Sequence, residues 1–267
     1  MSMQILPIKQ VEKVWGRDTL PQPFEAPEGE RIGEIWFEPP AMLDTILAKY
    51  LFTSEKLSVQ VHPDDARAPQ GSRGKEECWL VLDAEPGAQL AIGFDEPIDA
   101  DTMRQAAEDG SIEQRLMWHD VRAGDFFYLP AGTVHAIGGG LSLVEIQQNS
   151  DITYRLFDYG RPRELHLEDG VAVADGGRYA EKWHRHIHAD TNERLVDGPH
   201  FQLDQCIGTP DASMKSSYAR PVAVMVLSGN ATMDGQSIRP GECGVADNLE
   251  RLEAEPGSRL LLFAEAG

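Results

Sequence analysis

The sequence has 267 residues, of which 41% are hydrophobic and 25% are charged, and this length can bury a core in one large or two small domains. Its formal net charge is −20, with a pI near 4.7. An acidic surface of this size repels nucleic acid and anionic membranes, so we expect neither as a partner. No stretch approaches the roughly 18 apolar residues of a membrane helix.

Two features favour a cytoplasmic location. The N-terminal segment MSMQILPIKQVEKVWG lacks the long apolar region of a signal peptide. The three cysteines are odd in number and far apart, which suits a reducing compartment better than a disulfide framework.

Short strand-like runs separated by glycine and proline dominate the first 160 residues. This texture predicts a mainly β protein, a sandwich or a barrel. The predicted strands are Met42–Ala48, Leu57–His62, Cys78–Leu82, Gln89–Gly93, Asp125–Leu129, Leu141–Gln147 and Asp151–Asp158.

Later segments divide the chain further. Residues Asp99–Trp118 are rich in helix formers and predict one or two short helices, inserted at about residues 97–118. After about residue 170 the pattern loosens into a polar connector, and strand-like runs then resume. The sequence thus predicts a first domain at 1–170, and a linker with a smaller β domain at 171–267. The predicted strands of the second domain are Phe201–Ile207, Val222–Leu227, Asn230–Met233 and Arg259–Ala264.

A group of polar residues in the first domain predicts a metal site. Gln60 and His62 are two apart on a predicted strand and share one face. His135 ends the pattern G-x5-P-x-G-x2-H, a strand followed by a tight turn, and a carboxylate is available at Glu76 or Glu77. Such a mixed nitrogen and oxygen site suits Zn²⁺, and Mn²⁺, Co²⁺ or Fe²⁺ could also bind.

The G-x5-P-x-G-x2-H segment resembles the second cupin motif. More narrowly, LSVQVHPDD, GKEECW, GDFFYLPAGTVHAI and QNSDITYRLFDYGR resemble the type I mannose-6-phosphate isomerases in their shorter bacterial form. The resemblance covers roughly residues 10 to 170. It implies a double cupin of two jelly-roll β-barrels, one Zn²⁺ ion per chain, and interconversion of mannose 6-phosphate and fructose 6-phosphate. The second barrel, which lacks the histidines, would hold no metal.

The resemblance also implies roles for individual residues. It selects Glu77 over Glu76 and places Arg155 near the reacting sugar carbons, with Glu145 as the matching glutamate. Lys56 competes with the lysines matched to the phosphate. The implied metal ligands are Gln60, His62, Glu77 and His135, and the implied phosphate-binding residues are Ser58, Lys49 and Lys75.

Isomerisation through an enediol(ate) needs a base, and Glu145 is the first candidate. Burial is expected to raise its pKa, and a salt bridge with Arg155 or a lysine is the structural alternative. A histidine that longer family members carry shortly after the equivalent of Trp36 is absent here, so its proton-transfer role cannot be transferred.

Other interpretations stay open at this level. A cupin of another class, either a sugar-binding module or a metal-dependent oxygenase, is the alternative function, although an amide ligand at Gln60 suits oxygen activation poorly. The chain is expected to be a monomer or a homodimer that acts on a small sugar phosphate. Seven more side chains are interpreted mainly as structural: Cys78 as packing, Trp15 and Trp36 as packing or as lining the pocket, with packing favoured, His166 as structural or supporting, and His184, His186 and His188 as unrelated to the metal site.

Overall fold

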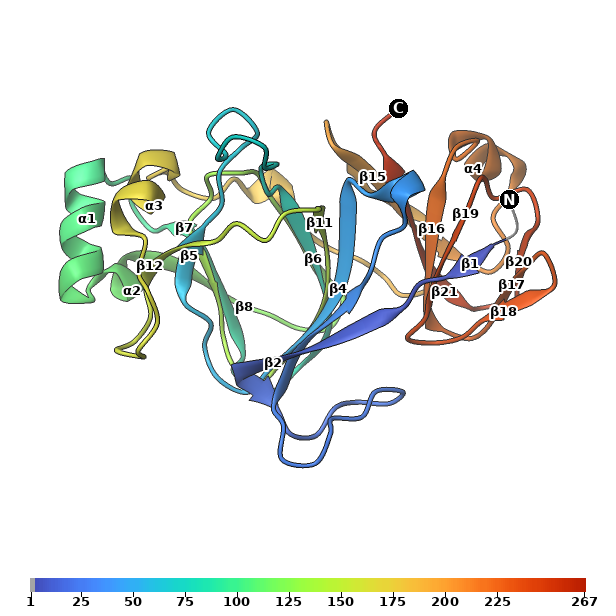
Figure 1. Ribbon diagram of the computed structural model, residues 1–267, viewed down its shortest axis with the longest axis horizontal. Coiled ribbons are helices and arrows are strands. Elements are labelled where there is room, and N and C mark those ends of the chain that lie inside the picture. The colour runs from blue at the N-terminus through green and yellow to red at the C-terminus, as the bar shows by residue number, and fades with distance from the viewer. Residues whose placement is uncertain (1–2) are drawn as a thin grey trace.

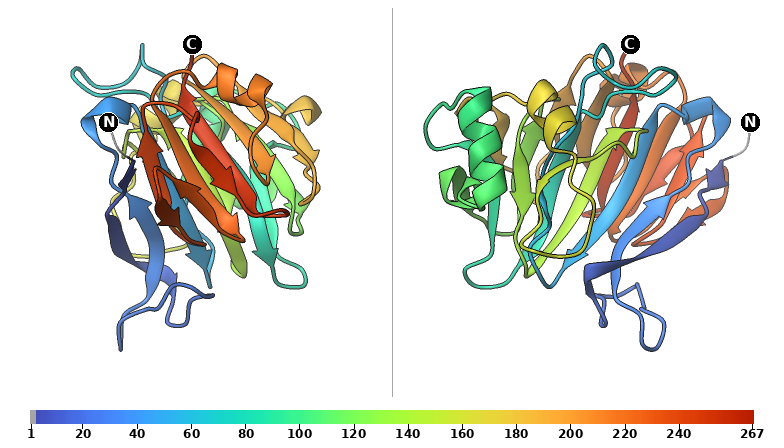
Figure 2. Two further views of the ribbon diagram at one scale, coloured as in Figure 1. Left: turned by 90° about the vertical axis from the view of Figure 1, so that its right-hand side faces the viewer. Right: turned by 60° about the vertical axis from the view of Figure 1, so that its left-hand side comes forward.

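The computed structural model describes residues 3–267, which form four antiparallel β-sheets stacked one behind another (Figures 1 and 2). The first sheet contains, in order, β12 (Tyr154–Phe157), β5 (Val59–Val61), β10 (His135–Ile137), β7 (Gln89–Phe94) and β8 (Leu116–Asp120). The second contains β13 (His184–His186), β9 (Asp125–Leu129), β6 (Glu77–Ala84), β11 (Leu141–Gln148), β4 (Ile46–Thr53), β3 (Ile32–Phe37) and β2 (Ile8–Arg17). These two sheets face each other and form the first barrel.

The remaining two sheets form the second barrel. The larger contains β1 (Gln4–Ile5), β19 (Cys243–Ala246), β16 (Val222–Ser228), β21 (Arg259–Glu265), β15 (Phe201–Ile207) and β14 (Glu193–Asp197). The smaller contains β18 (Gln236–Ile238), β17 (Ala231–Met233) and β20 (Leu252–Ala254).

The predicted helical insertion is present as two short helices, which lie with α3 on the outer face of the first sheet (Figure 1). Asp99 caps the first helix by accepting a hydrogen bond from the Thr102 N–H, and Gly110 ends it in the left-handed conformation. The insertion ends earlier than predicted, because β8 starts at Leu116. The helices are α1 (Ala100–Asp109), α2 (Ile112–Arg115), α3 (Leu167–Val173) and α4 (Ala212–Ser217), with 3₁₀ turns at Ala41–Leu43 and Glu181–Trp183.

Two predicted segments differ from the structure. The strand expected at Met42–Ala48 begins at Ile46 and continues to Thr53, because Pro40 precedes a 3₁₀ turn over its first residues. The polar stretch after residue 170 is more ordered than a connector, since it contains the end of α3, a 3₁₀ turn, β13 and β14. No helix among residues 3–267 has the length and apolar character to span a membrane.

Successive side chains of β6 point in opposite directions and so belong to two different hydrophobic cores. On β6, Cys78 and Leu80 face the second barrel, whereas Trp79 and Val81 face the interior of the first barrel. The prediction that Cys78 packs in a core, opposite Glu77, is therefore confirmed.

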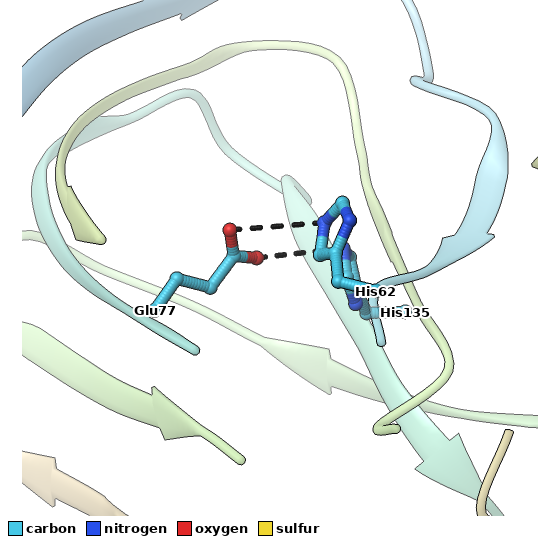
Figure 3. A group of neighbouring side chains, drawn as sticks. All are labelled: His62, Glu77 and His135. Carbon is cyan, nitrogen blue, oxygen red and sulfur yellow. Dashed lines mark ion pairs between the residues drawn. The ribbon is translucent and has the colours of Figure 1, made fainter. Parts of the chain in front are cut away.

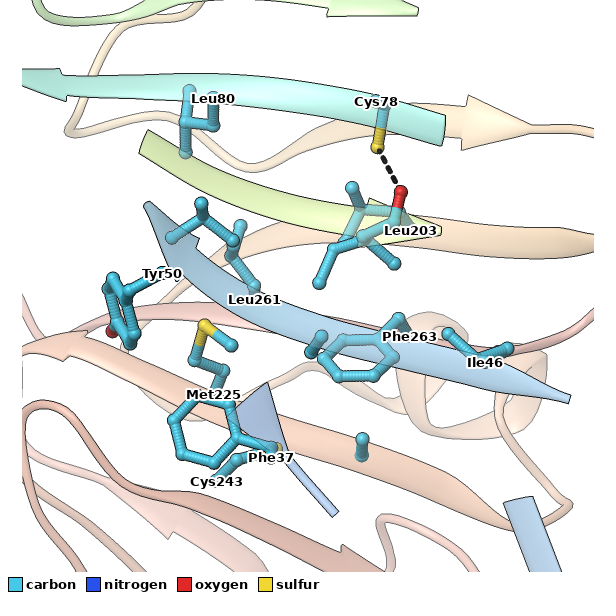
Figure 4. Packing of buried hydrophobic residues seen from close by; sticks show 14 of the residues in the cluster. Phe37, Ile46, Tyr50, Cys78, Leu80, Leu203, Met225, Cys243, Leu261 and Phe263 are labelled. Carbon is cyan, nitrogen blue, oxygen red and sulfur yellow. Dashed lines mark hydrogen bonds between the residues drawn. The ribbon is translucent and has the colours of Figure 1, made fainter. Parts of the chain in front are cut away.

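The two barrels share a hydrophobic core where their large sheets meet (Figure 4). Phe37 and Tyr50 of the first barrel pack in it with Met225 and Phe263 of the second. Main-chain pairing also connects the predicted domains, because β13 joins β9 of the first barrel and β1 joins β19 of the second. The boundary at residue 170 stays a prediction.

Candidate metal centre and active site

Three predicted ligands meet inside the first barrel. One ligand atom each from His62, Glu77 and His135 lies within 4.8 Å of the others, and all three side chains are buried (Figure 3). Glu77 Oε1 is 3.5 Å from His135 Nε2, and Glu77 Oε2 is 3.8 Å from His62 Nε2. Within residues 3–267, no second group of three such residues has a comparable arrangement.

Strand register brings these side chains together. Val59 and Val61 pack outward against the helices, so Gln60 and His62 project into the barrel. Gln60 is paired directly with His135 across β5 and β10. The turn before His135 is tied to His62, whose carbonyl oxygen accepts the Gly132 N–H at 2.8 Å.

The turn needs glycine at its tip. Gly132 has a φ of +88°, and a Cβ there would lie 3.0 Å from the Val173 carbonyl oxygen. This requirement explains why a glycine precedes the histidine in the P-x-G-x2-H pattern.

Both histidines are prepared to act as ligands. The Nδ1 of His62 lies 2.7 Å from the Ile152 carbonyl oxygen, and the Nδ1 of His135 lies 2.9 Å from that of Thr133. Because a carbonyl oxygen only accepts, each Nδ1 carries the ring proton and each Nε2 presents a lone pair. Burial lowers the pKa of His62 well below its usual value and lowers that of His135 to about 4, so both rings are neutral at physiological pH.

Gln60, the fourth predicted ligand, contacts the same cluster. Its Nε2 is 3.2 Å from His135 Nε2, and its Oε1 accepts a hydrogen bond from Ser58 Oγ at 3.1 Å. A half-turn of the amide exchanges these atoms, placing the oxygen beside His135 while Ser58 accepts from the nitrogen. Either orientation keeps Gln60 at the edge of the cluster.

The donor set fits a divalent cation. Glu77 Oε1 is buried without a hydrogen-bond partner among the described residues. The Lys75 ammonium donates to Glu77 Oε2 and lies 3.2 Å from His62 Nε2. Burial nevertheless raises the pKa of Glu77 above its usual value. A metal ion here would stabilise the ionised carboxylate and compete with Lys75 for the same atoms.

A cavity of about 350 Å³ adjoins the cluster through Gln60 and Lys75, which line the cavity and contact the cluster residues. Two cross-strand pairs build its walls: Arg155 lies opposite Gln60, and Lys49 lies opposite Glu145. Larger cavities of about 580, 410 and 360 Å³ lie elsewhere, and none of them is lined by a predicted site residue. The six predicted residues that line the 350 Å³ cavity are Lys49, Ser58, Gln60, Lys75, Glu145 and Arg155.

Glu145 is held by two buried lysines. Its Oε1 is 3.1 Å from Lys49 Nζ and 3.8 Å from Lys75 Nζ, and its Oε2 accepts from Trp79 Nε1 at 3.0 Å. The expectation that burial raises its pKa is wrong. Burial acts in that direction, but Lys75 and Lys49 outweigh it and the pKa of Glu145 is lowered. The salt bridge to a lysine, given as the structural alternative, is therefore present, and the role of Glu145 as a base stays a prediction.

Arg155 is half-buried, and its guanidinium is held in place by the backbone of a nearby loop. Its Nε donates to the Glu164 carbonyl oxygen at 3.1 Å. Its two terminal nitrogens have no hydrogen-bond partner within residues 3–267. Burial and then the neighbouring Arg163 lower the pKa of Arg155, and both guanidinium groups line the cavity. Arg163 is paired with the buried Asp158, so Arg155 supplies the unpaired positive charge on this wall among the described residues.

Sequence reasoning missed or gave too little weight to several cavity residues. Packing was favoured for Trp15 and Trp36, with pocket lining as the alternative, and both residues line the cavity, with the Lys49 ammonium 4.7 Å from the Trp36 ring centroid. Arg163 was not singled out, although its place in the R-P-R segment after Asp158 was a signal. Lys56, the competing lysine, instead pairs with Glu113 and is not among the residues that line this cavity.

The histidine run near residue 186 is not part of the centre. His184 stacks on Phe127 at 4.2 Å, and His186 hydrogen-bonds Asp125. This agrees with its interpretation as unrelated to the metal site.

Comparison of the fold with solved structures gives a close match. The crystal structure of the mannose 6-phosphate isomerase from Bacillus subtilis superposes with a TM-score of 0.76, over 98% of this chain and 99% of that one, at 22% identity. The prediction of a mainly β, cupin-type double barrel is therefore confirmed.

Sequence comparison identifies the family. No family model matches the chain. It is 43% identical over 211 residues to a mannose-6-phosphate isomerase of Streptococcus mutans, covering 74% of this chain and 66% of that protein. It is 34% identical over 213 residues to one of Bacillus subtilis, covering 74% and 67%. Each match thus spans about two thirds of the relative, and this chain belongs to the mannose-6-phosphate isomerase family.

Proposed function

We propose that this protein interconverts mannose 6-phosphate and fructose 6-phosphate through an enediol(ate) intermediate. The observation that carries the proposal is the buried His62–Glu77–His135 cluster, which contacts Gln60 and Lys75 at the edge of a cavity where cationic side chains outnumber anionic ones, in a member of this family.

The cluster and the family together indicate a divalent metal ion. We propose that this ion is zinc, one per chain, held by Gln60, His62, Glu77 and His135. Two neutral imidazoles, a carboxylate and an amide oxygen suit zinc. The proposed carboxylate ligand atom is Glu77 Oε1, which is buried and has no hydrogen-bond partner in the described part of the chain. When bound, the ion would act as a Lewis acid toward the sugar oxygens.

Arg155 would stabilise negative charge as it develops on the sugar oxygens. Its terminal nitrogens are free among the described residues, and Glu164 fixes the orientation of the guanidinium. A preorganised cation in a half-buried wall is more effective than a solvated one, because it needs no rearrangement during the reaction.

Glu145 would accept and return the proton moved between C1 and C2. Lys49 and Lys75 keep it ionised, which is the form a base requires. The same lysines make it a weak base, so approach of an anionic intermediate to the lysines would raise its proton affinity when transfer is needed.

Phosphate would be held by Ser58, Lys49 and Lys75. All three line the cavity, and cations gathered at one place offset the repulsion that a −20 chain exerts on a dianion. Neighbouring Arg155 adds to this local positive potential, whereas the charge of Arg163 is offset by Asp158.

The proposal also covers the location of the protein in the cell and its oligomeric state. Cys78, Cys206 and Cys243 are free and buried, which suits a cytoplasmic location. The oligomeric state, monomer or homodimer, stays a prediction.

A coupled assay for fructose 6-phosphate formed from mannose 6-phosphate tests the function. Metal-replete protein should turn over, and absence of turnover would refute the proposal. Oxygen uptake measured in parallel addresses the alternative of an oxygenase, for which the amide at Gln60 is an unsuitable ligand.

A further inference from the structure

His166 lies at the start of α3 and lines the same cavity as Arg155 and Gln60. Its contacts with Arg155 run in both directions. The His166 backbone N–H donates to the Arg155 carbonyl oxygen at 2.8 Å, and the Arg155 backbone N–H donates to His166 Nδ1 at 3.3 Å. The histidine ring is therefore attached to the strand that carries the proposed catalytic arginine.

This attachment fixes which ring nitrogen carries the proton. A backbone N–H can only donate, so Nδ1 must present its lone pair and the neutral ring holds its proton on Nε2. No residue within 3–267 accepts a hydrogen bond from His166 Nε2. The ring therefore offers the cavity a donor whose tautomer and orientation are set in advance.

The His166 side chain does not cap its helix. His166 occupies the N-cap of α3, yet its side chain makes no capping hydrogen bond to the helix. Its side-chain nitrogen is used across the loop, toward Arg155, and not along its own helix.

The loop between Asp158 and His166 is held rigidly. The buried Asp158 carboxylate accepts from Arg163 Nε and from Arg163 Nη2, both at 2.6 Å, and from Arg161 Nε at 3.0 Å. Glu164, in the same loop, accepts from Arg155 Nε. One anchored loop thus sets the positions of both Arg155 and His166.

We propose that His166 serves the isomerase with two different atoms. Nδ1 positions Arg155 through its backbone, and Nε2–H donates a hydrogen bond to an oxygen of the bound sugar phosphate. The inference rests on the proposed function and adds to it a substrate-binding donor and a positioning contact.

Two amide substitutions separate the two roles. In His166→Asn the side-chain oxygen takes the place of Nδ1, so the Arg155 contact is kept and the donor is lost. In His166→Gln the amide nitrogen takes the place of Nε2, so the donor is kept and the Arg155 contact is lost. His188→Asn, at an exposed histidine remote from this cavity, is the matched control.

The variants are compared by kcat and KM for mannose 6-phosphate, with thermal unfolding to check that each folds. We expect His166→Asn to raise KM about 10-fold with kcat within about two-fold, and His166→Gln to lower kcat about 10-fold with KM within about three-fold. An unchanged KM in the first or an unchanged kcat in the second would overturn the inference. A wild-type protein without turnover would instead refute the proposed function.

A spectroscopic measurement on the wild type needs no variant to fold. Nitrogen-15 NMR of the histidine rings at about pH 8, where an ordinary histidine is neutral, should show His166 Nδ1 without a proton and Nε2 with one. The reverse tautomer would overturn the inference.

Discussion

Replacing Glu77 with glutamine removes the anionic member of the His62–Glu77–His135 cluster while keeping its shape. The carboxylate is 1% exposed, so it lies in the barrel interior and not at the protein surface. Disturbing groups that merely support a metal ligand weakens binding by about 10–100-fold. Loss of the ligand charge itself should therefore weaken binding by at least about 100-fold.

This loss converts into a stability difference. A metal present at about 100 times its Kd stabilises the folded protein by about 2.7 kcal/mol. After a 100-fold loss of affinity, the same metal concentration contributes about 0.4 kcal/mol. For a protein of this size, the metal-induced rise in Tm should fall from about 5–11 °C to about 1 °C.

The metal-free variant should fold at least as well as the wild type. Burial outweighs the attraction of Lys75 and raises the pKa of Glu77, so the buried charge is unfavourable without a metal. A glutamine oxygen can still accept from the Lys75 ammonium. Differential scanning fluorimetry with and without zinc, together with metal analysis and the isomerase assay, measures these effects.

Glu76→Gln is the matched control. Glu76 is the adjacent residue, but it faces the opposite way and pairs with Tyr128 and His200. It should keep the metal and the metal-induced rise in Tm. The reasoning would be refuted if Glu77→Gln kept the full metal-induced shift, or if Glu76→Gln lost it.

Three other predictions follow from the geometry. Arg155→Ala should retain zinc but lose about 10²–10³-fold in kcat, because the guanidinium stabilises charge that develops during the reaction. Metal analysis with steady-state kinetics checks this, and a wild-type kcat would remove Arg155 from the mechanism. The pKa of Glu145 is lowered, so the stability that its ionised form contributes is present above its ordinary pKa of about 4.5 and is lost as the pH falls toward about 2. Urea unfolding of the metal-free proteins should show Glu145→Gln less stable than wild type at neutral pH, with the difference shrinking between about pH 4.5 and 2. A difference that stays constant over this range would contradict the assignment. Met225→Ala should destabilise the shared core between the barrels by about 2–5 kcal/mol without changing KM, and a normal unfolding midpoint would show that the barrels do not depend on that core.

Strand alternation carried much of the site prediction. A period of two placed Gln60 and His62 on one face, and it placed Cys78 opposite Glu77, because a residue on a pleated strand can reach only one side. The turn pattern ending at His135 was equally local, since Gly132 needs a positive φ. These features depend on neighbours in sequence, which is why they could be predicted.

The features that were missed depend on contacts between residues that are far apart in the sequence. The lowered pKa of Glu145 comes from Lys49 on β4 and Lys75 before β6, and no local pattern shows that both ammonium groups point at it. Arg163 reaches the cavity because Asp158 folds its loop back. Trp36 lines the cavity because its strand pairs with β4, which carries Lys49.

The central claim is that one zinc ion in the His62–Glu77–His135 cluster supports aldose–ketose isomerisation. Titration of zinc into chelator-treated protein, with the initial rate of fructose 6-phosphate formation as the readout, tests it most directly. The account predicts a negligible rate without metal and a rise that saturates at one zinc per chain. A full rate in the metal-free protein, or no recovery when zinc is restored, would contradict it.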